Sequence, residues 1–223
     1  MKAYLNKISK IILDIIYPPA CGICGKLCDE EICRKCEIKI EKKIQVGTDD
    51  YTQDEEKYFN EHFYMFGYYG IMRDKILEYK FNDKTYLYKM FSKIIINNKK
   101  IYEKIKDYDI IIPVPIHKKR NIERGYNQCE LIAKNISEHF YISLNTKSLK
   151  KNKNITAQST LTREKREENT KNAYICINEE LIQNKNILIF DDVYTTGNTV
   201  NECSKVLKKA GAKNIGIFTI LKT

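Results

Sequence analysis

The sequence predicts an α/β protein, with a parallel sheet flanked by helices and a small four-cysteine module in front of it. Apolar runs of strand length at 109–115, 187–190 and 214–221 are typical of strands buried on both faces. Segments with helical apolar spacing separate these runs, including 199–210 between the last two. Such a strand–helix–strand order implies a right-handed crossover, and therefore a parallel sheet.

The other elements follow from apolar spacing and polarity. The N-terminal segment has helical spacing, and Asp14 interrupts its apolar run, which favours a docking helix over a signal peptide. Residues 147–172 are charged and lack apolar periodicity, which is typical of a functional or irregular loop. In chain order we expect a docking helix (2–16), the cysteine module (17–40), an irregular polar segment (41–62), an aromatic-rich strand (63–69), helices (71–79 and 86–105), the strand at 109–115, and a helix (127–140).

Composition limits the class of protein. The chain has 223 residues and a formal net charge of +10, which allows one domain, here 46–223, plus an accessory module, here 1–45. The charge favours polyanionic ligands such as nucleic acid or pyrophosphate, although A/T-rich codons would also enrich a chain in Lys, Asn and Ile. The apolar runs are too short to span a membrane. Because the eight cysteines are not spaced as a disulfide framework, we expect a cytoplasmic location.

Two Cys-x-x-Cys pairs lie near the N-terminus. Each pair lets two thiolates converge on one cation, and two pairs complete the tetrahedral arrangement of structural zinc. The alternative is a redox dithiol or a disulfide pair. Cys28 either replaces one ligand or packs, while Cys129, Cys176 and Cys203 are expected to be ordinary small apolar residues. The expected zinc ligands are Cys21, Cys24, Cys33 and Cys36.

The most informative segment is Ile187-Leu-Ile-Phe-Asp-Asp-Val-Tyr-Thr-Thr-Gly-Asn-Thr199. Backbone amides of its turn and of the helix start suit a phosphate. Carboxylates would repel that phosphate, so we expect Asp191 and Asp192 to face sugar hydroxyls or a hydrated metal ion. Phosphate, diol and metal together indicate a phosphorylated ribose. The alternative is a strand–helix turn of another α/β protein, in which the acids cap the helix.

This segment closely resembles the signature of type I phosphoribosyltransferases, which bind phosphoribosyl pyrophosphate (PRPP). Further motifs are Tyr-Pro-Pro-x-Cys-x-x-Cys near the N-terminus, Val114-Pro-Ile-His117, Arg124-Gly-Tyr-Asn-Gln128, Gln158-Ser-Thr-Leu161 and Arg166-x-x-Asn169. With them, nearly the whole chain resembles the ComF family (the ComFC and GntX group). The resemblance implies a type I phosphoribosyltransferase-like fold with an N-terminal zinc finger. For many members it also implies a role in natural transformation, with single-stranded DNA and other cytoplasmic DNA-processing proteins as partners.

The resemblance also assigns site residues. Asp191 and Asp192 are the implied catalytic pair, which holds ribose hydroxyls and, through water, the Mg²⁺ that accompanies PRPP. Asn198 stands where many phosphoribosyltransferases have Gly, and Asn tolerates unusual backbone angles. The loop after the central strand approaches pyrophosphate in this fold, although its charges would otherwise simply be solvated. The implied PRPP-binding residues are Tyr194, Thr195, Thr196, Gly197, Asn198, Thr199, His117, Lys118, Arg120 and Arg124.

The charged loop at 147–172 admits three interpretations: a lid over the sugar phosphate, a track for single-stranded DNA, or a solvated loop. Its candidate DNA-binding residues are Lys150, Lys151, Lys153, Arg163 and Arg166. Because no base-recognition pocket is evident, three functions stay open. They are a competence protein that binds PRPP and single-stranded DNA, an active phosphoribosyltransferase of nucleotide metabolism, and a PRPP-sensing regulator.

Overall fold

The computed structural model describes residues 19–152 and 173–223. The chain divides into two compact units, Met1–Ile44 and Gln45–Thr223. The described part of the first unit contains the bridge between Ala20 and Leu27 and the helix α2 (Arg34–Glu41). The helix expected at 2–16 and the motifs within 158–169 lie outside the described residues.

The second unit contains a six-stranded sheet in the order β1-β2-β8-β7-β3-β4. The edge strand β1 runs antiparallel to β2, and all the other neighbours are parallel. The α/β class with a parallel sheet is therefore confirmed. The strands are β1 (Gly47–Asp50), β2 (Glu61–Gly67), β3 (Ile110–Pro113), β4 (Ser143–Leu144), β7 (Asn186–Tyr194) and β8 (Asn214–Lys222).

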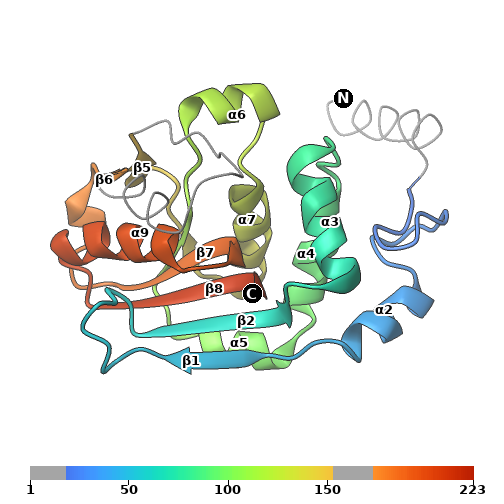
Figure 1. The fold of residues 1–223 in the computed structure, drawn as a ribbon, viewed down its shortest axis with the longest axis horizontal. Coiled ribbons are helices and arrows are strands. Elements are labelled where there is room, and N and C mark those ends of the chain that lie inside the picture. The colour runs from blue at the N-terminus through green and yellow to red at the C-terminus, as the bar shows by residue number, and fades with distance from the viewer. Residues whose placement is uncertain (1–18, 153–172) are drawn as a thin grey trace, which may run out of the picture. The chain divides into compact units, whose positions relative to one another are not determined.

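Helices cover both faces of this sheet (Figure 1). Ile187 and Ile189 of β7 share one core cluster with Leu207 of α9, and the hairpin β5–β6 adds Tyr174 to that cluster. Because side chains alternate along a strand, Leu188 faces the opposite side, where α7 packs on β3 and β7, and α4 packs on α7. The flanking elements are α3 (Gly70–Phe81), α4 (Leu87–Ile96), α5 (Lys99–Ile105), α6 (Lys118–Arg124), α7 (Gln128–Phe140), β5 (Leu149–Lys151), β6 (Tyr174–Cys176), the 3₁₀ turn η1 (Glu179–Leu181) and α9 (Asn198–Lys209).

Several expected boundaries were wrong. The segment 41–62, expected to be irregular, contains β1, with the sequence Gly-Thr-Asp-Asp. Backbone pairing holds this edge strand, so it does not need the apolar alternation by which a strand is recognised in a sequence. The helix expected at 86–105 is two helices, since the side chain of Asn98 caps α5 by accepting from the Ile101 amide. Strand β5 lies inside the charged segment expected to be a loop.

Strand β7 is longer than its apolar run. It continues through both acids to Tyr194, because its pairing with β8 continues to Lys222. Both acids therefore lie in the C-terminal part of the strand and not in the loop after it. Among the helices within 19–152 and 173–223, none combines the length and apolar character needed to cross a bilayer.

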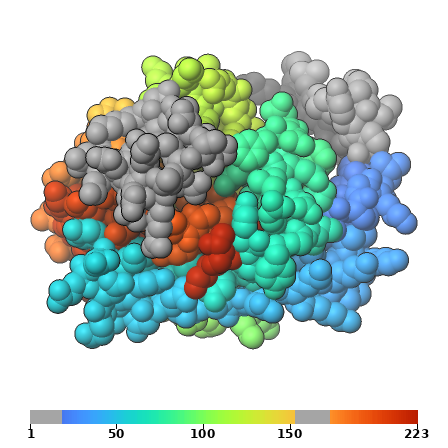
Figure 2. Space-filling view, in the orientation of Figure 1, coloured from blue at the N-terminus to red at the C-terminus, as the bar shows by residue number. Residues whose placement is uncertain are grey.

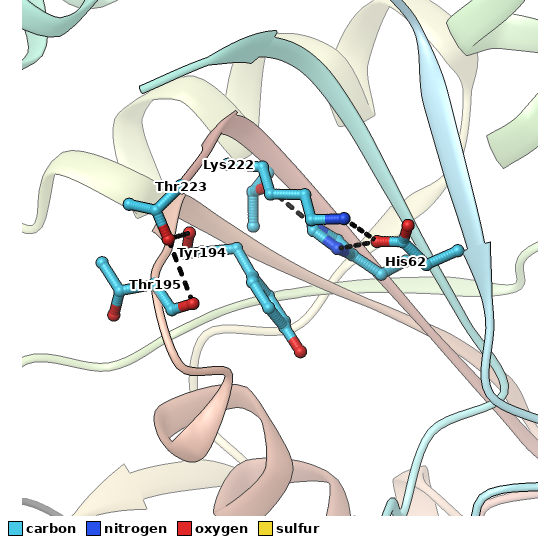
Figure 3. A network of polar contacts seen from close by, with 7 residues as sticks. His62, Tyr194, Thr195, Lys222 and Thr223 are labelled. Carbon is cyan, nitrogen blue, oxygen red and sulfur yellow. Dashed lines mark hydrogen bonds and ion pairs between the residues drawn. The ribbon is translucent and has the colours of Figure 1, made fainter. Parts of the chain in front are cut away.

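A buried histidine joins three strands beside the end of β7 (Figure 3). His62 of β2 is fully buried, and its Nδ1 lies 3.3 Å from the Asp49 carboxylate of β1. Since a carboxylate only accepts, Nδ1 carries the proton and Nε2 accepts from the Thr219 hydroxyl of β8 at 2.8 Å. The Lys222 ammonium also binds Asp49, at 2.6 Å. The ring of His62 stacks on Tyr194 at 4.1 Å between centroids, so this network supports the end of β7.

We predict that His62 makes the free energy of unfolding depend on pH. Burial lowers the pKa of His62 to about 4, against the attraction of Asp49. Between about pH 6.5 and pH 4 the unfolded chain binds a proton that the folded protein lacks, so stability falls as the pH falls, by about 3 kcal/mol in total.

Urea unfolding at a series of pH values measures this slope. His62→Gln should flatten it over that range, whereas His139→Gln, at an exposed position, should leave it as in the wild type. An equal slope in the wild type and in His62→Gln would contradict the prediction.

Candidate functional site

The junction between β7 and α9 forms a short, partly exposed turn. Thr195 and Thr196 are exposed, and Gly197 precedes the first residue of α9 with φ of 77°. A side chain at this glycine would also strike the Tyr194 hydroxyl, because an added Cβ would lie 2.3 Å from it. The buried Nδ2 of Asn198 has no hydrogen-bond partner within the described residues. The turn therefore presents free donors at the positive end of a helix.

The C-terminal end of β8 holds this turn in place (Figure 3). The Thr223 amide donates to the Tyr194 carbonyl at 3.0 Å, and its hydroxyl donates to the Thr195 carbonyl at 3.2 Å. Figure 2 shows this end of β8, in red, at the surface beside the teal-green atoms of α3. The Tyr194 side chain is 7% exposed and stacks on His62. Its ring is therefore a buried support for the turn.

The two acids at the end of β7 have unlike surroundings. Asp192 is buried, and both its oxygens are bonded: Oδ1 lies 2.7 Å from the Lys80 ammonium, and Oδ2 accepts from the Gln128 amide at 3.3 Å. Asp191 is half-buried, and its Oδ1 accepts from the Asp192 amide at 2.9 Å and from the Cys129 thiol at 3.4 Å. Oδ2 of Asp191 makes no hydrogen bond to another residue in 19–152 or 173–223. Of the four carboxylate oxygens of the pair, it is thus the one without a bond to a described residue.

Electrostatics tie Lys80 to this pair. Burial lowers the pKa of Lys80, but the carboxylates of Asp192 and Asp191 outweigh that effect and raise it overall, so the ammonium stays charged. Burial raises the pKa of Asp191, and the charge of Asp192 adds to the shift while Lys80 opposes it. Burial, together with both carboxylates, also raises the pKa of Cys129, which is therefore a thiol donor.

Neither the role of Lys80 nor the bond from the Cys129 thiol to Asp191 was predicted from the sequence. Lys80 lies four residues after Ile76, and both Ile76 and Tyr79 are fully buried. Lys80 therefore shares the buried face of α3, and this helical spacing was the available signal. Cys129 is buried, as expected of a small apolar residue, but its thiol also bonds Asp191.

The expected pyrophosphate loop contains the short helix α6. His117 caps it, since Nδ1 accepts from the Lys119 amide at 3.2 Å, and Lys118 is exposed while Arg120 is half-buried. Arg124 donates to Oε1 of Gln128, so it is linked through Gln128 to Asp192.

The helix that follows α6 begins as expected. The Asn127 side chain accepts from the Cys129 amide at 3.1 Å, so Asn127 caps α7. Its Nδ2 also donates to the Val114 carbonyl at 3.1 Å, which fixes the start of α7 to the end of β3.

The candidate DNA-binding residues separate into two groups. Lys150 is exposed on β5, whereas Lys151 is half-buried with its ammonium 5.3 Å from the centre of the Tyr174 ring. Lys153, Arg163 and Arg166 lie outside the described residues.

The four cysteines of the N-terminal unit converge. The Sγ atoms of Cys21, Cys24, Cys33 and Cys36 all lie within 4.8 Å of one another, and the Cys24 and Cys33 sulfurs are 3.9 Å apart. Four thiolates at 2.3 Å from one tetrahedral zinc ion are separated by roughly 3.8 Å, so this set fits a structural metal.

Backbone amides favour the thiolate form of one member of the cluster, Cys21. Burial raises the pKa of Cys21, but the backbone amides of Cys24 and Cys33 outweigh it and lower the pKa to about 6. Cys28 is not part of the cluster, and its thiol donates to the Glu30 carbonyl at 3.0 Å. Cys28 is therefore the spare cysteine.

Comparison with known proteins agrees with this arrangement. The phosphoribosyl transferase domain model matches residues 127–223. The chain is 28% identical to Competence protein F of Haemophilus influenzae over 151 residues, which are 66% of each chain. It is 30% identical to Competence protein ComFC of Streptococcus pneumoniae over 166 residues, 71% of this chain and 66% of that protein. It is also 30% identical to the DNA utilization protein YhgH of Shigella flexneri over 115 residues, 52% of this chain and 50% of that protein.

The chain thus spans between half and two thirds of the length of these relatives. The domain match contains the whole of β7, α9 and β8, and with them the acids and the glycine turn. The motifs, the parallel sheet and these relatives together show that the chain belongs to the ComF family of phosphoribosyltransferase-like proteins.

Proposed function

We propose that this protein binds PRPP with Mg²⁺ at the β7–α9 junction, binds single-stranded DNA, and acts in DNA uptake and natural transformation in the cytoplasm. Two of the relatives are named competence proteins and the third a DNA utilization protein, which supports the cellular role. The single observation that carries the ligand is the Oδ2 of Asp191, which bonds no other described residue, beside the partly exposed turn at Gly197 that starts α9.

The phosphate of the ligand is assigned to the turn 195–199. The first amides of a helix have no partner within the helix, and they carry its partial positive charge. Gly197 lets the backbone approach closely, and the unpartnered Nδ2 of Asn198 adds a donor. A phosphate monoester satisfies all of these groups at once.

The two acids then divide their roles. Asp191 accepts from a ribose hydroxyl through its free oxygen, whereas Asp192 holds Lys80 and Gln128 in place. From the sequence we expected both acids to contact the sugar. We now propose that only Asp191 does so and that Asp192 positions Lys80 and Gln128. Carboxylate oxygens are ligands that Mg²⁺ accepts, often through water, so this site fits a hydrated ion. When bound, Mg²⁺ would neutralise charge on the pyrophosphate group.

We expect the two acid-to-amide variants to differ. Asp191→Asn should weaken binding of PRPP with Mg²⁺ about 10- to 100-fold, as for a lost hydrogen bond to a charged group, with little loss of stability. Asp192→Asn leaves the Lys80 ammonium without its closest partner, and it should lower the free energy of unfolding by about 3 kcal/mol.

Calorimetric titration with PRPP, with and without Mg²⁺, and urea unfolding measure these two effects. Asp74→Asn, at an exposed residue of α3, is the control and should change neither quantity. Unaltered binding by Asp191→Asn would refute the ligand assignment. Pyrophosphate release that depends on an added nucleobase would instead favour an active phosphoribosyltransferase.

We also propose that the four-cysteine cluster holds structural zinc. Cys21→Ser should lower the zinc content of the purified protein and destabilise its N-terminal unit, because zinc binding stabilises small modules that bury little apolar surface. Cys28→Ser removes a cysteine outside the cluster and should keep the full content. Mass spectrometry measures the zinc content of each variant, and a full zinc content in Cys21→Ser would remove Cys21 from the ligand set.

The DNA-binding proposal is tested through salt dependence. Each lysine that contacts a phosphate of single-stranded DNA contributes about 0.7 to the slope of log K against log salt concentration. Lys150→Gln with Lys153→Gln should therefore reduce that slope by about 1.4 in fluorescence titrations with an oligonucleotide. Lys99→Gln with Lys100→Gln, on α5, is the matched control. If both double variants keep the wild-type slope, the DNA lies elsewhere.

A further inference from the structure

An exposed aromatic side chain lies at the end of α3, next to the acid pair. Phe81 is the last residue of this helix and is 68% exposed. Lys80, the residue before it, holds its ammonium 2.7 Å from the Asp192 carboxylate. A single exposed ring needs no explanation in a folded protein. Phe81 differs because the chain around it is fixed to the acid pair.

Two hydrogen bonds and a ring contact join the end of α3 to the start of α7. The Tyr126 hydroxyl donates to the Tyr79 carbonyl at 2.8 Å, and the Tyr79 hydroxyl donates to the Gln128 carbonyl at 2.9 Å. The two tyrosine rings stack at 5.7 Å between centroids. Because the Gln128 side chain also bonds Asp192, the backbone that carries Phe81 is held in place beside the acids.

A planar cation accompanies the exposed ring. The central carbon of the Arg124 guanidinium lies 5.8 Å from the centre of the Phe81 ring. The same guanidinium donates to Gln128, which restrains its position. Aromatic rings and guanidinium planes are the side-chain surfaces on which unpaired nucleic-acid bases stack. Phe81 and Arg124 together therefore suit the flat face of a base.

Helix α6 adds positive charge next to this surface. Its seven residues, Lys118–Arg124, contain four cations and one acid. Lys118 and Lys119 are exposed, and neither forms an ion pair with another residue in 19–152 or 173–223. An aromatic ring next to uncompensated cations is the arrangement by which proteins bind the bases and the backbone of a single strand. The charge thus favours a polyanion over an apolar protein segment as the occupant.

We propose that Phe81 and Arg124 form a stacking platform for one base of single-stranded DNA, whose backbone follows the cations of α6. The platform lies one residue from Lys80, so the base is held at the edge of the acid pair. This inference rests on the proposed binding of single-stranded DNA, and it adds a base contact to the backbone contact proposed for Lys150. Such a surface was not evident from the sequence, because only the fold places Phe81 beside Arg124.

Substitutions at Phe81 separate stacking from electrostatic attraction. Phe81→Ala should weaken binding of an oligothymidylate about 5- to 150-fold, the loss expected when one base–aromatic stack is removed. The slope of log K against log salt concentration should stay as in the wild type, because no phosphate contact is lost. Phe81→Trp keeps an aromatic face and should retain the affinity. Tyr141→Ala, at another exposed aromatic residue, is the matched control and should bind as the wild type does.

An oligomer of abasic deoxyribose phosphate tests whether the ring contacts a base. The wild type and Phe81→Ala should bind this oligomer with equal affinity, and a loss in Phe81→Ala as large as with the oligothymidylate would overturn the platform. Phe81→Leu keeps an apolar side chain without an aromatic face, so it should lose as much affinity for the oligothymidylate as Phe81→Ala. Fluorescence titrations measure these affinities, and urea unfolding verifies that each variant is folded.

The outcomes distinguish the platform from the proposed function. Wild-type affinity for the oligothymidylate in both Phe81→Ala and Phe81→Leu overturns the platform, while DNA binding stands. A wild type that does not bind the oligothymidylate refutes both. If Phe81→Ala keeps its affinity for DNA but loses binding of free adenine in the presence of PRPP and Mg²⁺, the surface serves a small-molecule acceptor and the assignment to DNA is wrong.

Discussion

Two neighbouring carboxylates at the end of a buried strand repel each other, and this repulsion is the constraint on which the site depends. Lys80 relieves it from α3 by binding Asp192, while Gln128 occupies the other oxygen of that acid. Counting contacts within 19–152 and 173–223, the pair is left with one free oxygen, on Asp191. A site that presents one carboxylate oxygen beside a compensating cation can accept an anionic sugar phosphate, whereas two bare carboxylates would repel it.

Strands β7 and β8 together hold the two acids and the glycine turn. Pairing of β7 with β8 extends to Lys222, so the acids and the glycine turn are fixed to one pair of parallel strands. Thr223 then bonds the carbonyls at the end of β7, and His62 supports the Tyr194 ring from the neighbouring strand. The distance between the acids and the start of α9 is therefore set by backbone hydrogen bonds and by buried rings.

The support of the site comes partly from outside the matched domain. Residues 127–223 match the phosphoribosyl transferase domain and include the acids and the turn. Lys80, Asp49 and His62 precede that match, yet they bind or pack against its residues. In this member of the ComF family, the first half of the second unit thus contributes the charge balance of the acid pair and the packing behind the turn.

Local residue types determined much of this protein. Apolar runs predicted the parallel strands, the spacing of Cys21, Cys24, Cys33 and Cys36 predicted their cluster, and the acids followed by a glycine turn predicted the junction. Each of these depends on chemistry within a short segment. The partners of the acids did not follow from the sequence, because Lys80 and Cys129 reach Asp192 and Asp191 only through the packing of α3 and α7. The unequal roles of two adjacent carboxylates, and the burial of Lys151 beside an exposed Lys150, were decided by tertiary structure alone, since long-range packing determines which side chains lose water.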